Sequence, residues 1–154
     1  MQKFKKSLRI PTEDTVRKKN LVLYIYNKSN AKLGDSLVNF IYSVAKSLVS
    51  EKPTGTKVSD SILLEAYKGS LWCKTDTLKL TGKKNRIADA IEALILFFWV
   101  HEDISLEELI ESLMDHLQPD RLHHPKEEHS TAVLSFLSLL DQLFRKYQGK
   151  NQTV

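Results

Sequence analysis

The sequence has little of what builds disulfide-linked, metal-ribbon or many-turned folds. Its 154 residues include one cysteine (Cys73), five glycines and four prolines. A single cysteine excludes an internal disulfide and a cysteine-ligated zinc cluster, and it fits a reducing cytoplasm. The scarcity of glycine and proline argues against collagen-like, linker-rich and many-turned all-β architectures.

Long hydrophobic runs are missing as well. The longest unbroken apolar run has eight residues, 93–100, whereas a helix needs about 18 to span a bilayer. The basic start, MQKFKKSLRI, has no apolar stretch behind it and does not resemble a secretory signal. We therefore expect no membrane association and a cytoplasmic location. The sequence also has no Gly-rich phosphate loop, no G-x-S-x-G elbow and no HExxH motif.

Charge is distributed unevenly along the chain. With 42% hydrophobic and 27% charged residues, the sequence can bury a core within one domain. Residues 1–20 carry seven Lys/Arg against two acids, and residues 101–142 carry ten acids against two basic residues. A basic end of this kind can bind phosphates, although it is equally typical of an ordinary solubilising surface.

The spacing of apolar residues predicts an all-α domain. Helical periodicity extends over residues 35–50, 60–68, 86–100, 105–117 and 130–147. Gly34 suits a break before the first of these helices. The N-caps that we predict are Asp35 or Ser36, Ser59 or Asp60, Asn85, and Ser105 in a capping box with Glu108.

The remaining segments are less regular. Residues 1–15 form a basic lead-in that Pro11 breaks, and we expect it to be extended or loosely ordered. Residues 16–27 suit a strand by propensity, but a buried helix is the alternative. We expect loops at 118–129 and at 73–82, where a short strand is the alternative. We therefore divide the chain into a lead-in over residues 1–15, one helical domain over residues 16–147 and a tail over residues 148–154.

The most informative segment is residues 87–100, IADAIEALILFFWV, in which only Asp89 and Glu92 are polar. A helix that is apolar nearly all round is buried, yet two carboxylates three residues apart share one face of it. Burial of two like charges is unfavourable unless something compensates, and a divalent cation such as Mg²⁺ is one answer. The other is a narrow hydrated stripe in which Asp89 pairs with Arg86.

Asp35 on its own is explained by helix capping, but the segment around it and the segment 87–100 together resemble two motifs of a known family. Residues 28–38, KSNAKLGDSLV, resemble the ribonuclease III signature E-R-L-E-F-L-G-D-S-V-L. Residues 88–95, ADAIEALI, resemble the second acidic motif of the same family, A-D-x-x-E-A-L-I. The two motifs occur in the family's order and separation, and the resemblance spans about residues 20–100.

The resemblance implies an all-α catalytic domain that cuts double-stranded RNA as a homodimer across a basic valley. It implies that Asp35, Asp89 and Glu92 are the catalytic residues and hold Mg²⁺ or Mn²⁺, which would activate water and stabilise the leaving oxygen. Lys83, Lys84 and Arg86 would contact RNA phosphates, although a solvated helix start explains them equally well. The 93–100 segment, Tyr24 and Tyr26 are candidate dimer-interface surface, or core.

The chain departs from the family pattern at three positions. Lys28 and Ala31 stand where the signature has glutamates, and Ala31 removes an expected metal ligand. Leu96 stands at a usual glycine. After residue 147 there is no room for a double-stranded-RNA-binding domain, as in the short bacterial and archaeal forms of the family.

Three functional hypotheses therefore stay open. The first is a metal-dependent endoribonuclease acting on double-stranded or structured RNA. The second is a catalytically inactive ribonuclease III-like module that binds RNA or serves as a scaffold. The third is a helical protein-interaction domain that uses the acidic residues of segment 101–142.

Two further groups of residues have weaker functional readings. The histidines of segment 123–129, HHPKEEH, could bind zinc or nickel, but an exposed loop is the simpler interpretation. The aromatic side chains are interpreted as packing residues rather than as platforms for RNA bases, and the acids of the 105–117 helix as its hydrated face. The aromatic residues concerned are Trp72, Phe97, Phe98 and Trp99.

Overall fold

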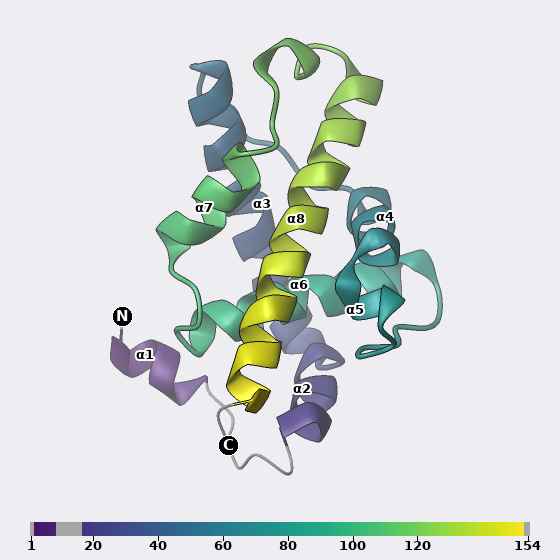
Figure 1. Cartoon of the computed structure of the whole chain (residues 1–154). Coiled ribbons are helices and arrows are strands. Elements are labelled where there is room, and N and C mark those ends of the chain that lie inside the picture. The colour runs from purple at the N-terminus through teal and green to yellow at the C-terminus, as the bar shows by residue number, and fades with distance from the viewer. Residues whose placement is uncertain (1, 9–16, 153–154) are drawn as a thin grey trace.

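The computed structural model describes residues 2–8 and 17–152, and this part of the chain is helical with no strand (Figure 1). The predicted all-α class is confirmed. The elements are α1 (Gln2–Ser7), α2 (Arg17–Ile25), α3 (Lys28–Ser50), α4 (Asp60–Gly69), α5 (Leu71–Lys74), α6 (Lys84–Val100), α7 (Leu106–Met114), the 3₁₀ helix η2 (Pro119–Arg121) and α8 (Pro125–Gln152).

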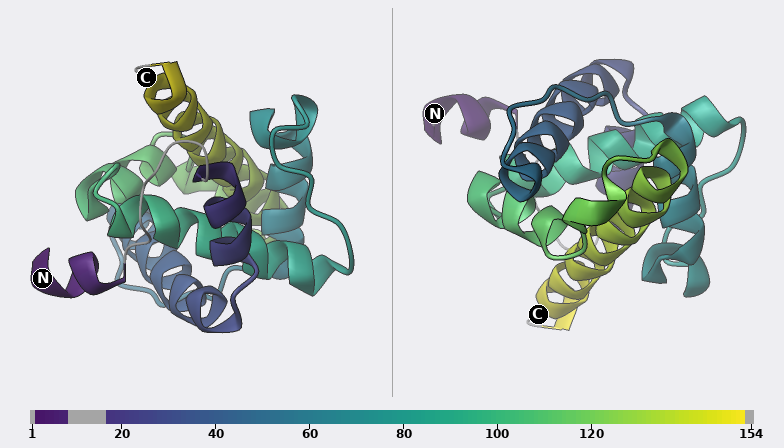
Figure 2. Two further views of the ribbon diagram at one scale, coloured as in Figure 1. Left: turned by 90° about the horizontal axis from the view of Figure 1, so that it is seen from below. Right: turned by 90° about the horizontal axis from the view of Figure 1, so that it is seen from above.

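Helix α6 is the centre of the molecule. It packs against α2, α3, α4 and α8, and Figure 2 shows α3 and α8 on opposite sides of it. Nearly all its side chains after Arg86 are buried, as its all-round apolar sequence predicts. Residues 93–98, Val100 and Tyr24 are core residues, so they do not form the interface surface that we had considered for them.

Helix α3 begins at Lys28, seven residues before the predicted start. Asn27 is the N-cap, and its side chain accepts hydrogen bonds from the backbone N–H groups of Ser29 and Asn30. Asp35 is therefore not a cap but lies two turns inside the helix. Gly34 is not a break either, because it lies where α3 touches α6: a Cβ there would overlap the carbonyl oxygen of Glu92 and stand 2.9 Å from the backbone nitrogen of Ala93.

Several other boundaries agree with the sequence or shift by a few residues. Ser59 caps α4, and Ser105 and Glu108 form the predicted capping box. Helix α6 begins at Lys84 after Lys83, so Asn85 lies inside it and is not its N-cap. Helix α7 ends at Met114, before the predicted residue 117.

The segments with open or irregular predictions are mostly helical. The helical alternative is correct for α2, although this helix is buried on one side only, since Leu23 is 64% exposed. Residues 2–7 form α1, and residues 1 and 9–15 of the predicted lead-in lie outside the described residues. Residues 71–74 form α5, and no strand follows in the described segment 75–83. Helix α8 includes the last residues of the predicted 118–129 loop and residues 148–152 of the predicted tail.

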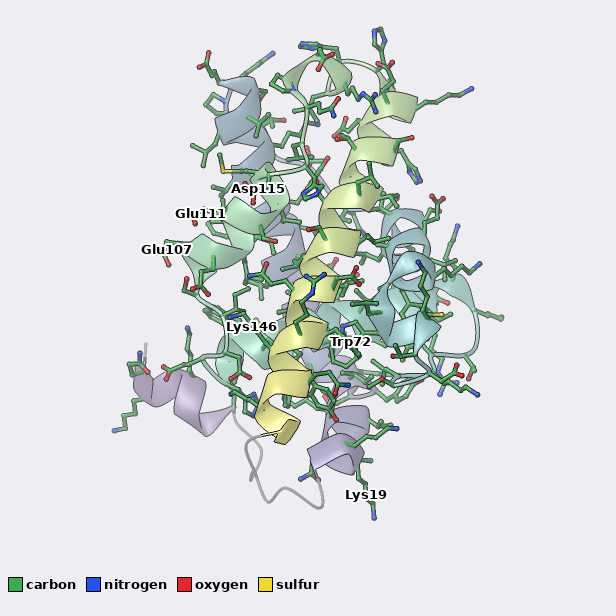
Figure 3. All side chains as sticks on the ribbon, in the orientation of Figure 1. Lys19, Trp72, Glu107, Glu111, Asp115 and Lys146 are labelled. Atoms are coloured by element: carbon green, nitrogen blue, oxygen red, sulfur yellow. The ribbon has the colours of Figure 1, made fainter. Side chains whose placement is uncertain are left out.

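The aromatic residues pack as predicted. Trp72 is fully buried, its indole N–H donates to the carbonyl of Leu140 at 2.8 Å, and Phe98, Phe144 and Tyr147 surround its ring. Trp99 is half-buried. The acids of α7 and the residue after it, Asp115, are exposed, and Figure 3 labels Glu107, Glu111 and Asp115. In the described residues, no helix combines the length and the apolar character that crossing a bilayer requires.

We expect the substitution Gly34→Ala to destabilise the protein although alanine favours helices. The added methyl would overlap backbone atoms of α6, which cannot move aside as a side-chain tip can, so α3 and α6 must separate. Such overpacking lowers the free energy of unfolding by about 1–3 kcal/mol. Urea unfolding followed by circular dichroism measures the change.

Gly149→Ala is the matched control. Gly149 lies in α8, and a Cβ there meets nothing within 4 Å, so this substitution should keep or slightly raise stability. Equal stability of the two variants would contradict the proposed role of the α3–α6 contact.

Candidate functional site

Four carboxylates line one cleft of about 340 Å³, which we call the carboxylate cleft. It opens beside the contact of α3 with α6, where Asp35 follows Gly34 and Glu92 provides the opposing backbone. Asp89 lies one turn earlier on α6. The residues lining the cleft are Lys28, Ala31, Lys32, Asp35, Lys57, Asp60, Asp89 and Glu92.

The structure brings the three acids predicted from sequence into this one cleft. Asp35 is half-buried, and its Oδ1 accepts a hydrogen bond of 3.0 Å from the side-chain amide of Asn39. The amide oxygen of Asn39 in turn accepts from the backbone N–H of Val58 at 2.8 Å. Asn39 therefore connects Asp35 to the segment that leads into α4. Asp89 is exposed, whereas the side chain of Glu92 is buried.

Sequence reasoning missed the fourth acid, Asp60. We had named it only as one of two alternative caps of α4, but Ser59 caps this helix and Asp60 is its first residue. An acid in the first turn is favoured by the helix dipole, so the sequence already offers a sufficient local reason for it. Only the tertiary fold, which packs α4 against α6, reveals that Asp60 faces the cleft.

Burial and the charges of neighbouring acids disfavour the charged forms of Asp89 and Glu92. Glu92 has its pKa raised to about 8, first by burial and then by the charges of Asp35, Asp89 and Asp60, while Lys57 acts in the opposite direction. The pKa of Asp89 is raised by partial burial and by Asp60 and Asp35. The cleft thus concentrates negative charge that a proton or a cation can neutralise.

The donor set suits a hard divalent cation, since Mg²⁺ and Mn²⁺ prefer carboxylate oxygens. In the part of the chain that the structure describes, however, no three His, Cys, Asp or Glu side chains form a ready-made metal-binding group. This holds for the segment 123–129 as well. His123 and His124 are exposed there, and the Nε2 atom of His129 lies 3.0 Å from Glu65.

The predicted RNA-binding residues lie at the start of α6 and are exposed. Lys84 donates to the hydroxyl of Ser61 at 3.2 Å. The guanidinium of Arg86 lies 5.0 Å from the ring centroid of Tyr26, and no described ion pair joins it to Asp89, so the pairing considered from sequence is wrong. Lys32 and Lys57 line the carboxylate cleft, and sequence reasoning had not singled them out.

Comparison with protein families gives a match that covers most of the chain. The family model is described as Ribonuclease III and covers residues 28–148. The match includes all four acids of the carboxylate cleft. A comparison with curated proteins finds no matching relative.

We expect the stability of the metal-free protein to fall as the pH rises from about 5 to 8.5. An acid whose pKa is raised by folding adds stability below its unfolded value of 4.5, and that stability is lost as the pH approaches the folded value of about 8. In Glu92→Gln the side chain stays neutral, so this variant should lose less stability over the same interval. Thermal unfolding in EDTA at both pH values measures the difference.

The control for this experiment is Glu107→Gln, on the outward face of α7. Its unfolding temperature should follow that of the unmodified protein at each pH. If Glu92→Gln also falls in parallel with the unmodified protein, burial of Glu92 does not govern the pH dependence.

Proposed function

Since the chain belongs to the ribonuclease III family, we propose that it is a metal-dependent endoribonuclease that hydrolyses phosphodiester bonds in double-stranded or structured RNA. The observation that carries the proposal is the gathering of Asp35, Asp60, Asp89 and Glu92 in one cleft. A cluster of like charges around the buried Glu92 is unfavourable for folding alone, so a cationic ligand gives it a physical reason.

In this proposal Asp35, Asp89 and Glu92 hold Mg²⁺ or Mn²⁺, and Asp60 adds a fourth negative charge. The carboxylates must turn toward a common point, because they do not form a ready-made group. When bound, such a cation acidifies a water molecule and neutralises charge that develops on the phosphoryl oxygens. Asn39 keeps Asp35 oriented, and Glu92 gives up its proton when the cleft gains positive charge.

Lysines on the wall of the carboxylate cleft support RNA as the substrate. Lys28, Lys32 and Lys57 are exposed, and their ammonium groups can approach the phosphates on either side of the scissile bond. Lys83 and Lys84 extend this positive surface along the start of α6. Double-stranded RNA is bound mainly through its phosphates and 2′-hydroxyls, so a basic rim around acidic ligands suits it.

We also propose that the protein acts as a homodimer, and the apolar outer side of α3 supports this. Leu33, Phe40 and Leu48 on that helix are 39%, 54% and 56% exposed. Two apolar depressions lie along the same side of α3, with Phe40 lining both. Contiguous exposed apolar surface of this kind is typical of a protein interface, and a second copy would cover it.

One observation favours an alternative function, a catalytically inactive RNA-binding or scaffold module. Ala31 and Lys28 occupy the positions of the usual signature glutamates, and both line the carboxylate cleft. A methyl group and an ammonium group replace two carboxylates there, and the one missing at Ala31 is an expected metal ligand. Such a protein would bind RNA in a salt-sensitive way without cutting it.

The first test is cleavage of long double-stranded RNA in Mg²⁺ and in EDTA. We expect cleavage only with the metal, and a loss of about 100-fold or more in Asp35→Asn and in Glu92→Gln, because each removes a carboxylate that would hold the cation, and the cation offsets the negative charge developing on the phosphoryl group. Asp115→Asn, at the exposed residue that follows α7, is the charge-matched control. Salt-sensitive binding without cleavage would instead support the inactive module.

A second test separates the two roles of the α4 start. Asp60→Asn should raise the Mg²⁺ concentration needed for half-maximal cleavage, because it removes charge from the cleft. Ser59→Ala should leave that concentration unchanged but lower stability by about 1 kcal/mol, because it removes only the cap. Titration of Mg²⁺ together with thermal unfolding of both variants measures this. An unchanged Mg²⁺ requirement in Asp60→Asn would remove Asp60 from the site.

A further inference from the structure

A second cleft of about 410 Å³ adjoins the carboxylate cleft, and we call it the Arg86 cleft. It lies where the end of α2, the start of α3 and the start of α6 meet. Its lining residues are Ile25, Tyr26, Asn27, Lys28, Ala31, Asn85, Arg86 and Asp89. Three of them, Lys28, Ala31 and Asp89, also line the carboxylate cleft, so the two clefts share a wall.

Contacts on two sides hold Arg86 at this wall. Its guanidinium lies over the ring of Tyr26, 5.0 Å from the centroid, in a cation–π arrangement. Its methylene groups pack against the loop at Gly82, where a Cβ would stand 3.1 Å from the Cδ atom of Arg86. Gly82 has a φ of 113°, a conformation that glycine alone adopts readily, so the loop can approach this closely.

The charges of the Arg86 cleft favour an anion. Arg86 and Lys28 contribute two positive charges against the single carboxylate of Asp89. No described ion pair uses Arg86, so its guanidinium donors are available to a ligand. Helices α3 and α6 both begin at this cleft, and the positive ends of their helix dipoles add partial positive charge to it. A planar guanidinium beside an ammonium group suits a phosphate.

Ala31 determines how the two clefts connect. Its side chain is a single methyl group on the shared wall, so it separates the two spaces less than a long side chain would. The position at which an expected ligand is absent thus lies on the wall that both clefts share. Because the clefts adjoin at this wall, a nucleic acid strand bound at the carboxylates would have its neighbouring phosphate on the side of Arg86.

We propose that the Arg86 cleft binds the RNA nucleotide next to the scissile bond, with Arg86 and Lys28 on its phosphate and the amide of Asn85 within reach of its 2′-hydroxyl. This inference rests on the proposed function and adds a specific subsite to it. Tyr26 is a positioning residue that keeps the guanidinium at the wall. Arg86 is thereby distinguished from Lys83, which lines neither cleft.

The test neutralises one phosphate at a time. A short RNA duplex with a mapped cleavage site is made with a methylphosphonate at the phosphate next to the scissile bond, or at a remote phosphate. The enzyme and Lys83→Ala should be slowed about 10-fold by the adjacent methylphosphonate, but Arg86→Ala by less than about 2-fold, because the contact is already lost. Circular dichroism checks that both variants are folded.

The possible results separate the two proposals. If the adjacent methylphosphonate slows Arg86→Ala as much as Lys83→Ala, the subsite is wrong while the endoribonuclease stands. If the unmodified protein does not cut at all in Mg²⁺, the proposed function fails, and binding of the same duplex in EDTA decides the subsite. Weakening of about 10-fold by Arg86→Ala against about 2-fold by Lys83→Ala supports it, and equal weakening overturns it.

A second pair of variants tests the positioning role. Tyr26→Phe keeps the ring under the guanidinium, so the adjacent methylphosphonate should slow this variant by about the same factor as it slows the unmodified protein. Tyr26→Leu removes the ring, and it should raise KM for the duplex several-fold while reducing the effect of the adjacent methylphosphonate. If Tyr26→Leu responds to the methylphosphonate as Tyr26→Phe does, the ring does not position Arg86.

Discussion

The close contact of α3 with α6 at Gly34 is the constraint on which the site depends. Because Gly34 has no side chain, the backbone of α3 reaches the carbonyl of Glu92. The next residue of α3 is then Asp35, which must face the cleft beside Glu92 and Asp89. The same crossing brings the first turns of both helices together, and this creates the Arg86 cleft. A larger residue at position 34 would push α3 away from α6 and would therefore disturb both clefts at once.

The placement of Glu92 in the core is unfavourable for the stability of the fold. Glu92 is buried in the most apolar helix of the molecule, where an apolar side chain would favour stability. The surrounding acids raise its pKa further, so the fold keeps a charge cluster that packing alone would eliminate. Local violations of the packing rules of this kind are expected at functional sites rather than elsewhere. The rest of α6 follows those rules closely, which makes Glu92 the exception.

The sequence predicts the helices of the core well because their apolar periodicity is strong. The burial of α6, the capping box at Ser105 and the start of α4 are all confirmed. The predicted start of α3 is wrong, because in the sequence Gly34 and Asp35 have the pattern of a helix break followed by an N-cap. Only the contact with Glu92 explains a glycine inside a helix, and such a contact joins residues far apart in the chain.

Some residues of the candidate site are likewise predictable from the sequence, and others are not. Spacing and resemblance predict Asp35, Asp89 and Glu92, because two of them lie three apart on one helix and the third lies in a recognisable motif. Asp60 and Lys57 carry no such signal, since a first-turn acid and a surface lysine both have ordinary local explanations. Their approach to the other acids depends on how α4 packs against α6. Their place in the site can therefore be found only from the three-dimensional fold and not from a sequence motif.

The departures at Lys28 and Ala31 have a different meaning once both residues are seen on a shared wall. Judged by the signature, they remove two carboxylates and leave Asp35, Asp89 and Glu92, which could still cut or could belong to an inactive module. In the fold, Asp60 brings a carboxylate to the cleft from another helix, and Lys28 stands between the carboxylates and Arg86. The change at Lys28 therefore puts a donor for a phosphate where the signature has a ligand for a cation, whereas Ala31 removes a carboxylate and adds no charge. The positive charge gained at Lys28 is of the kind that binds the phosphates of RNA.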